Sequence, residues 1–197
     1  SRDFLSLDQM PNSITFIGVG IISIEFASIT IKSGVETHMI HVDDEPLKGF
    51  YSAHVAKLMD KLAAEGVQFH MNEDTTAIKE QGDSYTVATE SGLEITTDYV
   101  LDATGRRPNV HGIGLEEAGV NFTTRGVQVD EYLRTNIPNI YASGDVLDKA
   151  IPKLTPTATF ESNYIAAHIL GMNDNPISYP AIPSVLYTLP RLSNIGV

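Results

Sequence analysis

Residues 14–23 read Ile-Thr-Phe-Ile-Gly-Val-Gly-Ile-Ile-Ser, and this stretch decides the fold. The apolar run at 14–17 predicts a short strand, and the two glycines of a tight turn follow it at once. Residues 21–32 are rich in apolar side chains and end at a Ser-Gly pair, which predicts a helix with a glycine stop. A second strand is expected at 36–42. Strand, glycine turn, helix and strand within about 30 residues form one βαβ unit, the smallest piece of a parallel doubly wound sheet.

The alternation of helix and strand continues beyond this unit. Residues 51–65 carry apolar side chains at helical spacing, and a strand is expected at 67–71. From Thr76 the pattern changes to short strands separated by glycine-containing turns, which predicts an antiparallel meander that ends in a strand at 99–103. The predicted fold class is therefore α/β, with a Rossmann-like doubly wound parallel sheet and an antiparallel β-meander.

The sequence pattern is less regular after residue 105 and before residue 14. Short strands are expected at 126–129 and 139–143, and a helix is expected at 156–170, where a glycine follows. An extended stretch lies at 182–188. Residues 1–13 are mostly polar and close on a Pro-Asn turn signal, so we expect a linker there.

The glycine turn has the form G-x-G-x-x-S, which is typical of a dinucleotide site. Gly18 can make the tight turn, Gly20 lets a pyrophosphate approach the backbone, and the small Ser23 lets helix and strand pack closely. The helix start then offers free N–H groups and a positive dipole end to the phosphates. A purely structural turn is the alternative, and the βαβ context favours the dinucleotide.

In such folds, residues at the end of the second strand contact the adenosine ribose. An acid there binds the 2′-hydroxyl of NAD, whereas an arginine accommodates the 2′-phosphate of NADP. Here His41-Val42 is followed by Asp43-Asp44-Glu45, and Lys48 is the only nearby cation. Three acids would repel a 2′-phosphate, so the sequence favours NAD(H) over NADP(H). A charge run that only solvates a turn is the alternative.

The composition excludes several classes of function. The 197 residues include 25 acidic and 13 basic side chains, and the net charge of -12 disfavours nucleic acid and anionic membranes as partners. No apolar run approaches the ~20 residues that span a bilayer, and the N-terminus lacks the layout of a signal peptide, so a cytoplasmic protein is expected. The sequence has no cysteine and so no thiol nucleophile of its own, and its six histidines lack the spacing of metal ligands.

Four motifs in order resemble the glutathione reductase and dihydrolipoamide dehydrogenase family of pyridine nucleotide-disulfide oxidoreductases. The first is the glycine turn with Glu25 behind it. Residues 102–109 are similar to the family's A-T-G-R-x-P-N segment, 140–146 to its Y-A-x-G-D segment, and 154–158 to its L-T-P-x-A helix start. The likeness covers essentially the whole chain.

The resemblance implies three domains: an NAD(P)-binding domain at 14–105, the C-terminal part of an FAD-binding domain at 106–175, and the start of an interface domain at 176–197. It also implies a homodimeric parent flavoenzyme that passes hydride from NAD(P)H to FAD and on to a small-molecule or protein disulfide. The implied NAD site consists of Gly18, Gly20, Ile21, Ile22, Ser23, Glu25, His41, Val42, Thr75 and Gly105. The implied FAD site consists of Gly144, Asp145, Leu154, Thr155 and Pro156.

Two of these FAD residues also suit their positions physically. Thr155 is a good N-cap and Pro156 suits the first helical position, so the helix would start where the family places the flavin pyrimidine. The resemblance also assigns Asp145 to a hydroxyl of the FAD ribityl chain, whose hydrogen bond an ionised carboxylate can accept; an ordinary turn aspartate and an ordinary helix cap are the alternatives. Three positions depart from the family's patterns: Ile21 replaces the tyrosine of glutathione reductases, Val42 the arginine of NADP-preferring members, and His41 the glutamate of many NAD-preferring members.

The family also needs parts that this sequence does not contain, namely a first FAD-binding glycine loop, a redox-active cysteine pair and a catalytic histidine. We therefore expect no catalytic residue within these 197 residues. Two other functions stay open: a flavin-dependent transhydrogenase or oxidase without the cysteine pair, and a non-catalytic NAD-binding module. A cysteine pair encoded upstream in the parent would favour the reductase.

Overall fold

The computed structural model describes residues 2–195, which form two compact units. The first unit contains the chain up to Gly105 together with the segment that starts at Pro183. The second unit spans Arg106–Ile182. Among residues 2–195, no helix is long and apolar enough to cross a membrane.

The first unit is built on a four-stranded parallel sheet with the strand order β3-β2-β1-β7. A three-stranded antiparallel meander, β4-β5-β6, and a hairpin, β10-β11, complete it. Its elements are α1 (Arg2–Leu5), β1 (Ser13–Ile17), α2 (Ile21–Lys32), β2 (Glu36–His41), α3 (Ser52–Ala64), β3 (Val67–Met71), β4 (Thr75–Gln81), β5 (Ser84–Thr89), β6 (Glu94–Thr97), β7 (Tyr99–Asp102), β10 (Ser184–Leu186) and β11 (Leu192–Asn194). The predicted parallel sheet and the predicted antiparallel meander are both confirmed, but the strand expected at 99–103 does not end the meander: as β7 it pairs in parallel with β1.

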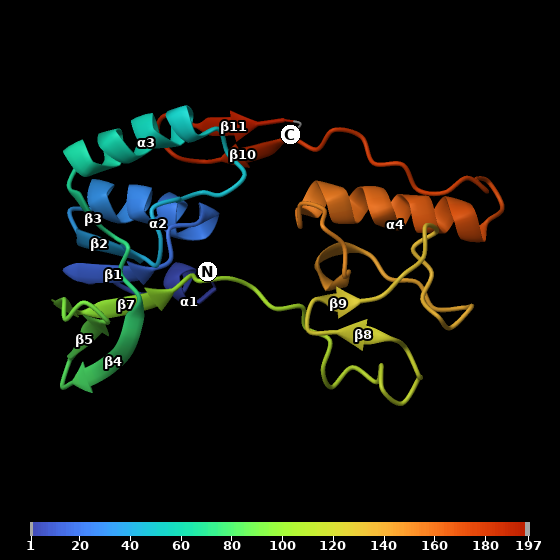
Figure 1. Ribbon diagram of the computed structural model, residues 1–197, viewed down its shortest axis with the longest axis horizontal. Coiled ribbons are helices and arrows are strands. Elements are labelled where there is room, and N and C mark those ends of the chain that lie inside the picture. The colour runs from blue at the N-terminus through green and yellow to red at the C-terminus, as the bar shows by residue number, and fades with distance from the viewer. Residues whose placement is uncertain (1, 196–197) are drawn as a thin grey trace. The chain divides into compact units, whose positions relative to one another are not determined.

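The parallel sheet is covered on both faces. Phe16 and Met39 belong to one core with α2 and α3, whereas their neighbours Ile17 and Ile40 belong to another with Val87 of the meander. Figure 1 shows the helices on one side of the sheet and the meander on the other. Strands buried on both faces read as continuous apolar runs, which is why the sequence at 14–17 showed no alternation.

The chain start differs from the expected linker. Residues 2–5 form α1, and the side chain of Phe4 is only 3% exposed. Its ring stacks on Phe26 of α2 with 4.3 Å between centroids. At the other end, the extended stretch expected at 182–188 forms a strand only at Ser184–Leu186, and Leu186 is buried in the same core. Both ends of the described chain therefore contribute to the core of the first unit.

The second unit has little regular structure. It contains β8 (Phe122–Thr123), β9 (Gly126–Val127), the 3-10 turn η1 (Gly144–Val146) and α4 (Thr155–Ile169). The strand expected at 139–143 is absent, because only a single bridge joins Tyr141 to Arg134. The N–H of Ile140 instead donates to the carbonyl of Ile137, 3.0 Å away, so a local turn takes one of the groups that a longer strand would need.

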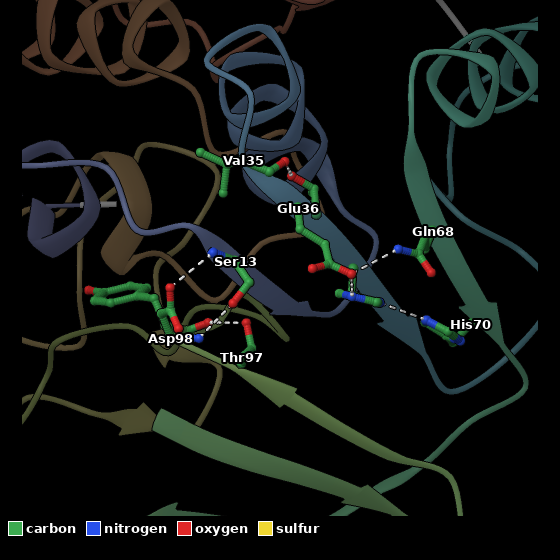
Figure 2. A network of polar contacts seen from close by, with 10 residues as sticks. Ser13, Val35, Glu36, Gln68, His70, Thr97 and Asp98 are labelled. Atoms are coloured by element: carbon green, nitrogen blue, oxygen red, sulfur yellow. Dashed lines mark hydrogen bonds and ion pairs between the residues drawn. The ribbon is translucent and has the colours of Figure 1, made fainter. Parts of the chain in front are cut away.

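Two histidines lie side by side on neighbouring strands of the parallel sheet. Nδ1 of His38 on β2 is 3.2 Å from Nε2 of His70 on β3, and the rings stack. Nε2 of His38 lies 3.3 Å from the carboxylate of Glu36, which also accepts from Gln68. Figure 2 shows this network of Glu36, Gln68 and His70 along the strands. Burial, and then the neighbouring His38, lower the pKa of His70, while Glu73 opposes them.

This lowered pKa makes the stability of the first unit depend on pH. Because the folded state disfavours protonated His70, its contribution is complete above the unfolded histidine pKa of about 6.5 and is lost as the pH falls from there through the lower pKa of the folded state. We expect the free energy of unfolding to fall between about pH 7.5 and about pH 5.5, and to fall less in His70→Gln. Urea titrations of both proteins at the two pH values measure this difference. An equal fall in both would show that His70 does not contribute.

Candidate dinucleotide-binding site

A cavity of about 540 Å³ opens at the carboxyl ends of β1, β2 and β7. Its walls come from the glycine turn after β1, the loop after β2, the segment that joins β3 to β4, and the residues after β7. In open α/β sheets, ligands bind in the crevice outside the carboxyl ends of the strands. The cavity therefore lies where the fold places a ligand.

The two glycines of the turn have different roles. Gly18 has a φ of +93°, and a Cβ on it would lie 2.9 Å from the carbonyl oxygen of Ala103 after β7. The fold itself therefore requires glycine at this position. Gly20 has an ordinary φ of -107°, and a Cβ on it would meet no protein atom within 4 Å. Because Gly20 lines the cavity, its missing side chain leaves space for a ligand rather than for the protein.

The buried side chain of Ser23 bonds to the backbone at the start of α2. The side chain is fully buried, and its hydroxyl accepts from the N–H of Gly20 at 3.0 Å and donates to the carbonyl of Gly20 at 3.1 Å. Ser23 therefore fixes the glycine turn on the helix and does not line the cavity. Ile21, one residue into the helix, is 38% exposed and does line it.

His41 connects the glycine turn to the loop after β2. Its Nδ1 lies 3.3 Å from the backbone nitrogen of Val19, which can only donate, so Nδ1 is the unprotonated nitrogen. Nε2 then carries the hydrogen and lies 3.1 Å from Oδ1 of Asp43 and 3.4 Å from the carbonyl of Glu45. Contacts on both sides therefore fix the orientation of the imidazole ring.

An ion pair stands beside this histidine at the cavity wall. Oδ2 of Asp43 accepts from Nζ of Lys48 at 2.7 Å. The Lys48 ammonium, followed by the backbone N–H of Glu45, holds the pKa of Asp43 below its ordinary value, and Asp43 in turn raises the pKa of Lys48. The one cation expected to attract a 2′-phosphate is therefore engaged with a carboxylate.

The remaining part of the cavity wall carries acidic side chains and one hydroxyl without a hydrogen-bond partner among the described residues. Glu73 and Asp74 follow β3 and line the cavity, as does Asp102 at the end of β7. The N–H and hydroxyl of Thr104 hold the pKa of Asp102 below its ordinary value. The side-chain oxygen of Thr75 is buried at this wall without a hydrogen-bond partner among the described residues. A buried polar atom of this kind calls for a partner that the protein does not supply.

The structure brings together six of the ten residues assigned to the NAD site. Those that line the cavity are Gly18, Gly20, Ile21, His41, Val42 and Thr75. Those that do not are Ile22, Ser23, Glu25 and Gly105. The carboxylate of Glu25 instead accepts the backbone N–H of Tyr187, 2.8 Å away. Glu73, Asp74 and Asp102 also line the cavity and were not predicted; Asp102 ends β7, and Glu73 and Asp74 lie within three residues of the end of β3, a position that could have indicated them.

The residues assigned to FAD lie in the second unit around η1. Gly144 has a φ of +76°, and its N–H donates to Oε2 of Glu161 at 2.6 Å. Glu161 is only 2% exposed, and its other oxygen accepts from the hydroxyl of Tyr179. Lys153 donates to the carbonyl of Asp145 at 2.8 Å. Hydrogen bonds from both sides therefore fix the turn, and Asp145 itself is exposed.

The helix after this turn begins one residue earlier than expected. Leu154 is the N-cap, with an extended backbone and no side-chain cap, and Thr155 is the first helical residue. The prediction of Thr155 as the N-cap was therefore wrong, and Pro156 occupies the second helical position. Proline is tolerated here because the first turn of a helix leaves its N–H groups without helical partners.

Comparisons with known proteins place the chain in one family and match its fold to solved structures. The profile of the family described as "Pyridine nucleotide-disulphide oxidoreductase" matches residues 1–162, most of the chain. The chain belongs to this family. Family members use FAD and NAD(P)H.

Named relatives of the chain are oxidoreductases. The chain is 35% identical to a dihydrolipoyl dehydrogenase of Chlamydia muridarum, covering 100% of this chain and 42% of the relative. It is 33% identical to a glutathione reductase of Burkholderia cepacia, covering 100% and 44%. The solved structure of LpdA from Mycobacterium tuberculosis matches with a TM-score of 0.89 at 25% identity, covering 100% and 42%. The HOCl-induced flavoprotein disulfide reductase RclA of Escherichia coli shares the fold, with a TM-score of 0.89 at 24% identity, covering 98% and 44%. The chain thus spans less than half the length of these relatives.

Proposed function

We propose that the chain forms the NAD(P)H-binding part, and a portion of the FAD-binding part, of a flavin-dependent disulfide oxidoreductase. The observation that carries this proposal is the cavity at the strand ends, where Gly20 leaves open space and the Thr75 hydroxyl is buried without a partner. A dinucleotide fits both features, because its pyrophosphate needs backbone access and its sugars offer hydroxyls. When bound, NAD(P)H would supply hydride to FAD, which would reduce a disulfide.

The residues of the chain have positioning roles in this proposal. Gly18 shapes the turn, Gly20 leaves room for the pyrophosphate, and Ser23 fixes the start of α2. The N-terminus of α2 would stabilise the negative charge of the phosphates. In the second unit, Asp145 would hold a ribityl hydroxyl and the start of α4 would face the flavin. The thiol steps need cysteine, which this sequence does not contain. The parent would be a cytoplasmic homodimer that acts on a small-molecule or protein disulfide.

We expect the chain to bind NADH more tightly than NADPH, on the order of tenfold at about pH 8. Asp43, Glu73 and Asp74 at the cavity wall repel a 2′-phosphate, and Lys48 is already paired. Titration calorimetry with both nucleotides measures the ratio. Asp43→Asn removes the carboxylate that holds Lys48 and should narrow the preference. Tighter binding of NADPH by the unaltered chain would contradict the preference for NADH.

We expect the chain alone not to retain FAD. The exposed dipole at the start of α4 would contribute about 0.3–1 kcal/mol to FAD binding. The hydrogen bond from a ribityl hydroxyl to the charged carboxylate of Asp145 would contribute about 1.5–3 kcal/mol. Together they fall short of the ~8 kcal/mol that micromolar binding requires. The absorbance spectrum after incubation with excess FAD and dialysis tests this. A retained flavin band at about 450 nm, on the order of one flavin per chain, would contradict it.

Two other functions of the parent have distinct signatures. A flavin-dependent transhydrogenase or oxidase would oxidise NADH with a quinone or oxygen as acceptor and would not need a cysteine pair. A non-catalytic module would bind NADH without any flavin partner. Assays of the full-length parent with a disulfide, a quinone and oxygen as alternative acceptors separate these functions from the disulfide reductase.

A further inference from the structure

Glu161 on α4 is the only acidic side chain that is buried among residues 2–195, with 2% of its surface exposed. Burial of a carboxylate is unfavourable unless hydrogen bonds compensate for the lost water. Oε2 of Glu161 accepts the backbone N–H of Gly144 at 2.6 Å, and Oε1 accepts the hydroxyl of Tyr179 at 2.7 Å. Both oxygens therefore have a donor, and both donors come from outside α4.

The first of these contacts holds the turn η1 against α4. The hydroxyl of Ser143 lies 3.0 Å from that of Ser162, the residue after Glu161. Gly144 has a φ of +76°, and a Cβ on it would lie 3.1 Å from the Cβ of Ala158. Side chains of one helix therefore contact two consecutive residues of the turn and leave little freedom to the backbone there.

The second contact fixes the carboxylate itself. Burial, and then the hydrogen bond to Glu161, raise the pKa of Tyr179, so its hydroxyl stays protonated at neutral pH and donates. The ring of Tyr179 is in turn held between neighbours, with its centroid 5.9 Å from that of Phe160 and 5.8 Å from Nζ of Lys149. The orientation of the carboxylate thus depends on a segment that follows α4.

Asp145 directly follows the glycine that Glu161 holds. Its carboxylate is 51% exposed and lies 3.8 Å from the exposed guanidinium of Arg106. An exposed ion pair of this kind contributes little to stability, so the carboxylate stays available to a ligand. The backbone of the turn therefore sets the direction in which this carboxylate is presented.

We propose that Glu161 is a positioning residue for FAD. By accepting the N–H of Gly144, its buried carboxylate determines where the Asp145 carboxylate meets the ribityl chain. Tyr179 supports this role by holding the opposite oxygen. The inference rests on the proposed function, in which Asp145 contacts the flavin cofactor.

The test measures the dissociation constant of FAD by fluorescence titration of the full-length parent after its flavin has been removed. Glu161→Leu leaves the N–H of Gly144 without its acceptor, and we expect the FAD constant to rise at least about tenfold. Glu161→Gln keeps an acceptor for this N–H and a donor for the Tyr179 oxygen, so it should stay within about threefold. The NADH constant, whose proposed site is formed by the first unit, should change less than about twofold in both variants.

A positioning role requires that Glu161 act through Asp145. In an Asp145→Ala background, Glu161→Leu should therefore change the FAD constant less than about threefold, because the group that it positions is missing. Glu131→Gln is the matched control, since Glu131 is an exposed glutamate of the same unit, and it should leave the FAD constant unchanged. Tyr179→Phe removes only the hydroxyl and should weaken FAD binding about threefold, which tests the same contacts if Glu161→Leu does not fold.

The possible results separate the inference from the function on which it rests. An FAD constant that is unchanged in both Glu161→Leu and Tyr179→Phe would overturn the inference. So would an equal loss from Glu161→Leu with and without the Asp145 side chain, because it would show a general effect on the fold. An unaltered parent that does not bind FAD would instead overturn the proposed function.

Discussion

Replacing Gly20 by valine should weaken NADH binding at least roughly 100-fold, equivalent to about 2.7 kcal/mol, and leave the fold intact. Gly20 has φ -107° and ψ -173°, an extended conformation that β-branched residues adopt without strain. A Cβ there meets no protein atom within 4 Å. The added methyl groups would instead occupy space at the cavity wall, on the path of the pyrophosphate beside the start of α2.

Calorimetry with NADH measures the loss of binding, and circular dichroism with thermal unfolding checks the fold. Gly18→Ala is the informative comparison, because its Cβ would lie 2.9 Å from the carbonyl oxygen of Ala103 in a left-handed backbone. That variant should lose stability as well as binding. Unchanged NADH affinity in Gly20→Val would refute the proposed path of the pyrophosphate.

Replacing Gly126 by alanine should destabilise the second unit by roughly 2–6 kcal/mol, from strain and overpacking together. Gly126 has a φ of +134°, a backbone angle that residues other than glycine rarely adopt. An added Cβ would also overlap the carbonyl oxygen of Val146. The neighbouring backbone is fixed, since the N–H of Asp148 donates to the carbonyl of Val127 at 2.9 Å. The strand and η1 would have to separate to admit the methyl group.

Hydrogen exchange of amides in residues 106–182 reports the stability of this unit within the full chain. Gly171→Ala is the matched control, because Gly171 also has a positive φ, +68°, but nothing lies within 4 Å of an added Cβ. It should cost only the backbone strain, about 1–2 kcal/mol. Equal losses of protection in the two variants would show that Gly126 is not required by the close approach of β9 and η1.

The βαβ unit could be predicted from sequence because its signals are local. The apolar run at 14–17, the glycine turn and helix after it, and the extended segment at 36–42 indicate the strand-helix-strand order from local sequence alone. The strand expected at 139–143 failed because pairing depends on a partner elsewhere in the chain. Ile140 and Tyr141 are typical strand residues, but a turn takes the N–H of Ile140, and the segment forms only a single bridge, to Arg134. The burial of Phe4 was missed because one aromatic in a polar segment carries no periodicity.

The candidate site was predictable where it depends on backbone conformation. The glycines at 18 and 20 could be assigned to the turn from their spacing, although their role toward a nucleotide stays a prediction. The orientation of the His41 ring could not be foreseen, because its partner Val19 lies 22 residues away and is an ordinary backbone N–H. The pairing of Lys48 with Asp43 likewise depends on how the loop after β2 folds. The cap at Thr155 was misplaced because the choice between adjacent residues rests on the dihedral angles of Leu154.

The division of labour between Gly18 and Gly20 has a consequence for the descent of this family. A Cβ at the first glycine would clash with the backbone, whereas one at the second would meet no protein atom, and we propose that a ligand uses the space there. Natural selection therefore acts on them separately: a lineage that gave up the nucleotide would keep the first and drift at the second. If the proposed role of the second glycine holds, the pair is a marker for sorting genomes: homologues with glycine at the first position and a bulky residue at the second are expected to fold without binding the nucleotide.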